Sequence, residues 1–315
     1  YGNGITTDRV YDPNNGHLLT IATTDGAAEL QSVSYEYDHL NNVKKRTDNT
    51  LNYYEEFNYD SLDRITTASL HAGSPDAVQS WTHDKTGNIS TVDGNAYEYE
   101  NNTEPDLANQ LISTPNQTTA FTYDANGNMT SGDGRVIQWT SFNKPSQITL
   151  GTEQVTYGYD ANHNRLTKTS PDRLHANSPA VDIVYIGKLY EERTYPSLNA
   201  IKEVNTIFAN GKAVATVEQV TNTTTNTVDA PVTLYLHSDH LGSIELLTRK
   251  LPVNGSYVVS EQNFDAFGKV RNLDGSDNPT KLPLFTMGFT GHEMEIESGL
   301  INMNADRKSV VEGKG

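Results

Sequence analysis

The chain has 315 residues, a formal net charge of −17 and no cysteine. This charge argues against nucleic acid or an anionic membrane as a partner, because both surfaces recruit clustered Lys and Arg. The lack of cysteine excludes disulfides and thiolate chemistry, and no stretch approaches the roughly 20 apolar residues that would span a bilayer. A cationic partner, or solubility alone, fits the charge better.

Seven short segments share one pattern: an aromatic residue or His, then Asp, and Gly, Asn, Asp or His three positions after the Asp. These last residue types tolerate a left-handed backbone conformation. An Asp that accepts backbone N–H bonds, followed by a residue with positive φ, is typical of a type I turn with a G1 bulge, which joins antiparallel strands. The pattern therefore predicts β-hairpins. The instances are Tyr11-Asp12 with Asn15, Tyr37-Asp38 with Asn41, Tyr59-Asp60 with Asp63, His83-Asp84 with Gly87, Tyr123-Asp124 with Gly127, Tyr159-Asp160 with His163, and Phe264-Asp265 with Gly268.

Residues on both sides of these turns have the period of a half-buried strand. Before the turns, apolar side chains occupy every second position, as in Val33, Tyr35 and Tyr37. After them, an apolar residue restarts the pattern at Val43, Ile65, Ile89, Met129, Leu166 and Val270. The turns recur about every 24 residues, which indicates a repeat architecture. We expect an all-β fold of tandem hairpins that continues as one array over residues 1–304, with Tyr99-Glu100 as a degenerate eighth copy.

Two segments depart from the array. Residues 205–236 carry apolar stretches separated by a polar run from Thr221 to Thr227, which predicts a hairpin with an exposed, mobile tip. Residues 305–315 have neither alternation nor turn chemistry and resemble a translated sequencing adapter, so we expect this tail to be an artefact. With no initiator Met and a repeat-like start, the sequence is expected to be a piece of a longer chain.

The Tyr-Asp-x-x-Gly-Asn unit, clearest at residues 123–128, resembles the YD repeat of Rhs proteins. The segment 235–243, with His237, Asp239, His240 and Gly242, looks like the approach to the end of the Rhs core. Residues 288–304 look like the Rhs-associated core motif, in Phe289-Thr290-Gly291-His292-Glu293 and in the segment from Ser298 to Asn304 that contains Gly299 and Leu300. The resemblance covers residues 1–304.

This resemblance implies a β-ribbon wound into a hollow shell that encloses a C-terminal toxin domain in a secreted or cell-surface bacterial protein. Bacterial members of the family also cut themselves after the core, at a segment with Asp-Pro and a following Gly-Leu. That segment is missing here, so neither a cleavage site nor the toxin is assigned. The resemblance therefore implies a non-enzymatic structural fragment, with self-cleavage restricted to the intact parent protein.

Three groups of residues admit a chemical interpretation beside a structural one. His237, Asp239 and His240 are potential metal ligands, but they lack an identifiable fourth ligand, and we favour a polar strand end. His292 and Glu293 suggest acid–base chemistry, yet no nucleophile elbow, His-Glu-x-x-His helix or phosphate loop occurs in the sequence. The repeat Asp residues could bind calcium, but turn capping explains them without an ion, and we expect no cofactor.

The rival function is a secreted or cell-surface module whose Tyr and Trp side chains stack on sugar rings of a cell-surface glycan. The structural alternative is that these rings form the core face of each strand, which we favour.

Overall fold

The computed structural model describes residues 1–73, 76–100, 109–115, 119–172, 175, 178–250, 256–272, 274–276 and 287–303. Asn304 and the atypical tail 305–315 lie outside the described residues. The described chain is built of antiparallel strands joined by turns, with two 3₁₀ segments, η1 (Pro196–Leu198) and η2 (Phe289–Gly291), which confirms the predicted all-β class. In the described residues, no helix is long and apolar enough to cross a membrane.

The chain divides into two compact units, each built from two segments distant in sequence. Unit 1 contains residues 1–97 and 235–292, and unit 2 contains residues 98–234 and the segment from Glu293 onward. Each unit therefore combines a run of hairpins with a later part of the chain.

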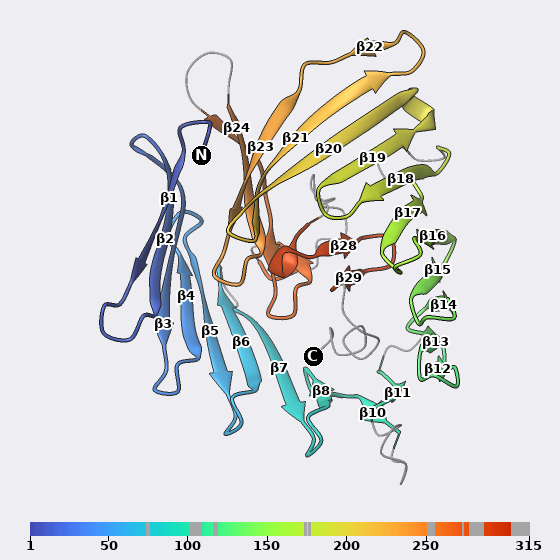
Figure 1. Cartoon of the computed structure of the whole chain (residues 1–315). Coiled ribbons are helices and arrows are strands. Elements are labelled where there is room, and N and C mark those ends of the chain that lie inside the picture. Colours follow the sequence, from blue (N-terminus) through green and yellow to red (C-terminus); the bar gives the residue numbers. More distant parts are fainter. Residues whose placement is uncertain are drawn as a thin grey trace. The chain divides into compact units, whose positions relative to one another are not determined.

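Unit 1 contains a nine-stranded sheet whose strands pair in chain order, so each strand is hydrogen-bonded to the next (Figure 1). Its strands are β1 (Thr6–Tyr11), β2 (Leu18–Asp25), β3 (Ala28–Tyr37), β4 (Val43–Asp48), β5 (Tyr53–Tyr59), β6 (Ile65–His71), β7 (Ala77–His83), β8 (Ile89–Val92) and β9 (Asn95–Ala96). The later segment supplies residues 235–238 of β23 (Val232–Ser238), then β24 (Ile244–Lys250), β25 (Ser256–Glu261), β26 (Asn263–Phe264) and β27 (Val270–Arg271).

Unit 2 repeats the arrangement, with consecutive strands paired antiparallel from β12 to β21. Its strands are β10 (Glu98–Tyr99), β11 (Leu111–Ser113), β12 (Thr122–Tyr123), β13 (Met129–Gly132), β14 (Arg135–Trp139), β15 (Pro145–Leu150), β16 (Glu153–Tyr159), β17 (Arg165–Ser170), β18 (Val181–Ile186), β19 (Tyr190–Tyr195), β20 (Ala200–Ala209), β21 (Lys212–Asn222) and β22 (Thr227–Val228), followed by β28 (Glu293–Glu295) and β29 (Leu300–Asn302).

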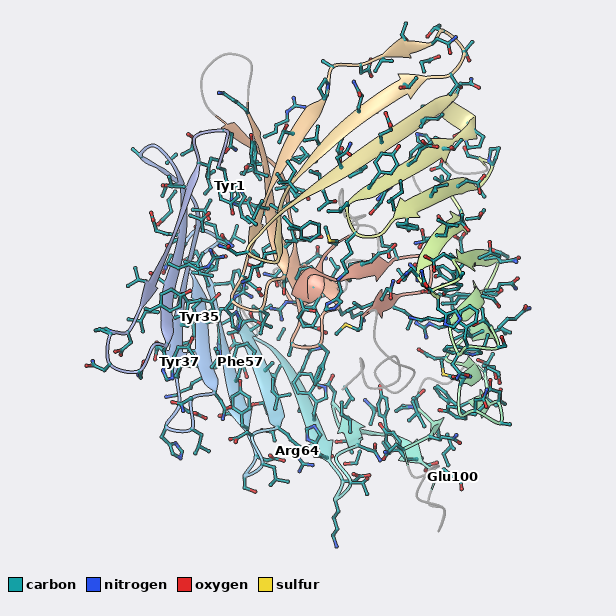
Figure 2. The ribbon with its side chains drawn as sticks, in the orientation of Figure 1. Tyr1, Tyr35, Tyr37, Phe57, Arg64 and Glu100 are labelled. Carbon is teal, nitrogen blue, oxygen red and sulfur yellow. The ribbon has the colours of Figure 1, made fainter. Side chains whose placement is uncertain are left out.

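Alternate side chains of the strands form the cores, as the period of two requires. Val33 and Tyr35 are 1% and 4% exposed and pack with Ile21 in unit 1. In unit 2, Val155 and Tyr157 pack with neighbouring strands in the same way. Figure 2 labels Tyr35 and Tyr37 on β3, and Phe57 on β5. The aromatic face is therefore the packed face of these strands.

The turn at Asp38 shows how each hairpin is closed. Asp38 Oδ1 accepts the backbone N–H groups of Leu40 and Asn42 at 2.8 and 2.9 Å, and Asn41 has φ +75°. The ladder shifts register just before Tyr37, as a bulge requires. The same two acceptor bonds recur at Asp60, Asp84, Asp124, Asp160 and Asp265, with positive φ at Asp63, Gly87, Gly127, His163 and Gly268.

Neighbouring repeats are tied together by their aromatic residues. The hydroxyl of Tyr59 donates to the carbonyl of Val43, the first residue of the preceding return strand, at 2.8 Å. Tyr37 makes the equivalent bond to Leu18, and Trp139 Nε1 makes it to Met129. At the turns, Arg64, which Figure 2 labels, donates to the carbonyl of Asp84 in the next hairpin. Through these hydrogen bonds, polar groups on the aromatic face fix the distance between neighbouring repeats.

Three expectations about the repeats are wrong in detail. In the first turn, Gly16 and not Asn15 has positive φ, because this turn is one residue longer and Gly16 N bonds Asp12 O. Leu166 is 43% exposed, since Arg165 takes the position opposite Tyr159. Tyr99-Glu100 does not form the short turn, because Glu100 N bonds the distant carbonyl of Gln110.

The polar run 221–227 is partly strand. Asn222 ends β21, and its Oδ1 accepts the N–H groups of Thr224 and Thr225 at 3.0 Å, before β22 pairs back onto β21. The apolar stretch before it belongs to a separate hairpin of β20 and β21, which turns at Asn210-Gly211. The predicted single hairpin is therefore two.

The valine substitution Gly127→Val tests the turn assignment. Gly127 has φ +78°, which a β-branched side chain adopts only with strain, so we expect a loss of about 1–3 kcal/mol in the free energy of unfolding. Urea denaturation of the whole chain measures the loss. Ala125→Val, at an exposed position in the same turn, is the matched control. Equal effects of the two variants would contradict the assignment.

Candidate functional site

The segment 235–243, predicted to lead to the end of the core, folds as a strand followed by a turn. Its polar residues have separate structural roles. His237 is fully buried, and its Nε2 and the Thr248 hydroxyl lie 2.9 Å apart. Asp239 Oδ1 accepts the N–H of Ser243, and Gly242 has φ +92°, so these residues close a hairpin of the repeat type. His240 packs against the ring of Tyr35 at a centroid distance of 4.6 Å.

In this placement, His237 and Asp239 are hydrogen-bonded to protein groups, and His240 packs on the ring of Tyr35. Over the described ranges of the chain, no group of three or more His, Cys, Asp or Glu side chains is placed to hold a metal ion. Burial, together with the N-terminal ammonium and Arg9, lowers the pKa of His237 to about 4, so the imidazole is neutral near pH 7.

Two buried clusters of charged residues are the most distinctive chemical feature of the described chain. The cluster of unit 1 joins the early sheet to the later segment. Arg46 of β4 lies 3.3 Å from Glu55 of β5 and pairs directly with Glu245 of β24. Arg271 of β27 pairs with the other oxygen of Glu55, and none of these four side chains is more than 8% exposed.

The core motif begins with a strained turn in unit 1. Gly291 has φ +72°, and Thr290, a β-branched residue, also has a positive φ of 51°. The Thr290 N–H donates to Ser243 Oγ at 3.1 Å, and the Thr290 hydroxyl lies 2.7 Å from His292 Nδ1. Because the same hydroxyl donates to the Phe289 carbonyl at 2.8 Å, it acts as an acceptor toward the imidazole. His292 therefore supports the turn, and this geometry does not activate Thr290 as a nucleophile.

The cluster of unit 2 contains the acidic residues of the core motif. Glu293 and Glu295 lie 2.8 and 2.5 Å from Nη1 of Arg165, which is on β17. Lys168 Nζ, on the same strand, lies 2.8 Å from Glu295 and 3.2 Å from Glu297. The Lys168 and Glu295 side chains are only 3% and 4% exposed.

Two tyrosines complete this cluster. The hydroxyl of Tyr157 donates to Glu295 at 3.0 Å, and that of Tyr185 donates to Glu293 at 2.9 Å. The Arg165 guanidinium also lies over the Tyr157 ring, 4.3 Å from its centroid. The acidic segment is thus held by charge, by hydrogen bonds and by aromatic contact.

The two carboxyls titrate in opposite directions. Burial opposes the charge of Glu295, but Lys168 and Arg165 outweigh it and lower the pKa of Glu295 to about 2. Burial and the nearby Glu295 charge raise the pKa of Glu293. Glu295 is therefore the ionised partner of the two cations. An ion pair of this kind anchors a segment, and a buried unpaired charge is costly when one member is removed.

The end of the core motif packs into the unit 2 core. Gly299 has φ +66°, and Arg135 Nε donates to the carbonyl of Ser298 at 2.7 Å. Leu300, on β29, packs against the cluster formed by Ile137 and its neighbours. The motif from Glu293 to Leu300 is therefore docked on the strands of unit 2 along its whole length.

Sequence reasoning singled out Glu293 of the unit 2 cluster and missed its cations. Lys168, like Arg46 and Arg271 in unit 1, occupies a buried position on a strand whose buried positions carry polar or charged side chains, and Arg165 lies on the same strand as Lys168. Arg165 carried a signal, because it follows the turn at the position where other repeats have an apolar residue.

The fold is that of the Rhs/YD-repeat type of toxin chain, as the sequence resemblance predicts. The crystal structure of TcdB2–TccC3 matches 96% of this chain with a TM-score of 0.69 and 17% identity, and the Photorhabdus luminescens Tc holotoxin pore, with a substitution in TccC3, matches 96% with 0.70 and 18%. The TcdB2–TccC3–Cdc42 complex matches 95% with 0.69 and 17%. The chain spans only 16–17% of the length of these chains. No family model and no curated protein sequence matches it.

Proposed function

We propose that this chain is a non-enzymatic wall segment of a secreted bacterial Rhs-type shell, which encloses and delivers a toxin domain encoded after the core. Its task is containment, and the enclosed domain of the parent chain is its partner. The fold shared with Tc toxin chains supports a shell role in general. The net charge of −17 favours a basic cargo over an acidic one.

The observation that carries the proposal is the docking of the segment from Glu293 to Leu300. Arg165 and Lys168 hold the three glutamates of this segment in a buried cluster. A segment anchored in this way fixes where the chain continues beyond the core, so the following domain starts from a defined place on the wall. The Tyr157 and Tyr185 hydroxyls bond the same glutamates, which places the segment on the aromatic face of the strands.

The alternative is a carbohydrate- or cell-binding repeat module. One observation favours it: Tyr11 is 53% exposed and available to stack on a sugar ring. The other repeat tyrosines use their hydroxyls to bind neighbouring strands, which favours the structural role.

Sequencing of the source DNA across codon 305, followed by expression of the complete reading frame, tests the proposal. We expect the frame to continue into a further domain that resists protease within the parent protein and is digested when expressed alone. A frame that stops after the tail, or a domain digested equally fast in both settings, would overturn it. Binding of the present chain to a glycan array, lost in Tyr11→Ala, would establish the alternative.

A further inference from the structure

The charges of the buried cluster in unit 1 do not balance. Four carboxylates and two guanidinium groups lie in this region, and every one of the six residues is less than 9% exposed. Coulombic interaction links Glu245 to Arg46, Asp239 and Asp48. Because uncompensated charge in a protein interior is strongly unfavourable, such a cluster must take up a cation or a proton. The six residues are Asp48, Glu55, Asp239, Glu245, Arg46 and Arg271.

Both oxygens of Glu245 have a hydrogen-bond donor, so a proton on this carboxyl needs an acceptor beside it. In the parts of the chain that the structure describes, no set of three acidic or imidazole side chains is placed to bind a metal. One Glu245 oxygen is paired with Arg46, and Gln31 Nε2 donates to the other at 3.2 Å. Glu245 is among the residues that line a cavity of about 30 Å³, and Gln262 and Asn263 are among its polar neighbours there. This cavity has room for one water molecule, which a protonated carboxyl can hydrogen-bond.

We infer that the unit 1 cluster binds one proton at Glu245 near neutral pH, and that loss of this proton weakens the packing of β24 on β3 and β4. This inference concerns unit 1 alone and is independent of the proposed function. It makes unit 1 a pH-responsive element in which β24 is most tightly packed when Glu245 is protonated.

The titration of Glu245 has the direction that this inference requires. Burial raises the pKa of Glu245 to about 7, Arg46 acts against this rise, and Asp239 adds to it. Burial also raises the pKa of Asp48 and lowers that of His240. Titratable or charged groups around Glu245 come from β3, β4, β5, β25, β27 and the turn before β24: Tyr35, Arg46, Asp48, Tyr53, Glu55, Asp239, His240, Glu261 and Arg271.

The sign of the effect follows from linkage. A carboxyl whose pKa is higher in the folded state than in the unfolded chain stabilises the fold below its unfolded pKa, and this contribution is lost as the pH rises through the folded pKa. For Glu245 the window extends from about pH 4.5 to about pH 7. A buried histidine with a lowered pKa acts with the opposite sign. The contribution of His237 is lost as the pH falls from about 6.5 to about 4, so it offsets the Glu245 effect over much of the same range.

The test is the stability of the whole chain against pH, with each unit observed separately. The chain has two tryptophans, Trp81 in unit 1 and Trp139 in unit 2, so 5-fluorotryptophan gives one ¹⁹F resonance per unit. We expect the ratio of the Trp81 unfolding equilibrium constants of the wild type and Glu245→Gln to rise on the order of a hundredfold between pH 5 and pH 8, because the His237 contribution is common to both proteins. Glu36→Gln, at an exposed position on β3, should keep a constant ratio to the wild type.

A pH profile for Trp81 that has the same shape in Glu245→Gln and in the wild type would overturn the inference. A direct measurement guards against failure of the variant to fold: a ¹³C NMR titration of the wild-type protein labelled at glutamate carboxyls. One carboxyl should titrate near pH 7 and be absent from Glu245→Gln if that variant folds. Titration of every resolved glutamate below pH 5.5 would also overturn it.

Discussion

Replacement of Lys168 by methionine is expected to destabilise unit 2 by about 3–5 kcal/mol, the largest effect of any single substitution that we propose. Methionine fills much of the space of the lysine stem but removes the ammonium group. Glu297 then loses the cation 3.2 Å away, and Glu295 keeps only Arg165 and Tyr157. The cost is large because these carboxylates are buried and cannot recover water.

Urea unfolding of the fluorotryptophan-labelled chain measures this loss. The midpoint reported by Trp139 should fall, while that of Trp81 should change much less, because Trp81 belongs to unit 1. Lys188→Met, at an exposed turn of unit 2, is the matched control and should change stability by less than about 0.5 kcal/mol. Equal midpoints for Lys168→Met and the control would refute a stabilising role for the cluster.

A second variant separates charge from packing. Combining Lys168→Met with Glu295→Gln and Glu297→Gln removes the unpaired charges and leaves similar volumes. Because replacing a whole buried ion cluster is often nearly neutral, the triple variant should be more stable than Lys168→Met alone. If it is less stable, the glutamates contribute mainly through hydrogen bonds such as that from Tyr157.

The repeat turns were predictable because their chemistry is local. Asp38 accepts N–H groups two and four residues away, so a single sequence window contains the whole structure. Turns were missed where another residue type replaces the Asp of the pattern or the aromatic residue before it. Thr140 with Asn143 closes the same turn without Asp, and Asp239 with Gly242 closes it after Ser238 instead of an aromatic residue. Relaxing the first two positions of the pattern would have found both.

The clusters were not predictable, because their members are far apart in sequence. Glu245 is 199 residues from Arg46, and Glu295 is 130 residues from Arg165. Strand alternation shows that Arg46 and Arg165 point inward but does not identify their partners. Glu293 was recognised as part of a segment that resembles the Rhs core motif, whereas its docking on β17 depends on tertiary structure alone.

Acidification from pH 4.5 to pH 2 is expected to remove on the order of 3 kcal/mol of stability from unit 2 through Glu295 alone. In the folded chain the pKa of this carboxyl is lowered to about 2, compared with 4.5 in the unfolded chain. A carboxyl with a lowered pKa stabilises the folded state above its unfolded pKa, and the contribution disappears as the pH falls through the folded value. Glu293 has a raised pKa and therefore contributes with the opposite sign, but only above pH 4.5.

The Trp139 resonance in urea, recorded from pH 5 to pH 2, measures this loss. Glu295→Gln should flatten the profile, and Glu98→Gln, at an exposed position in unit 2, should leave it steep. A wild-type profile as flat as that of Glu295→Gln would show that the cations do not hold this carboxyl ionised. Glu295 lowers the stability of unit 2 as the pH falls below about 4.5, and Glu245 lowers that of unit 1 as the pH rises from about 4.5 to about 7, so these two contributions are both fully present only near pH 4.5.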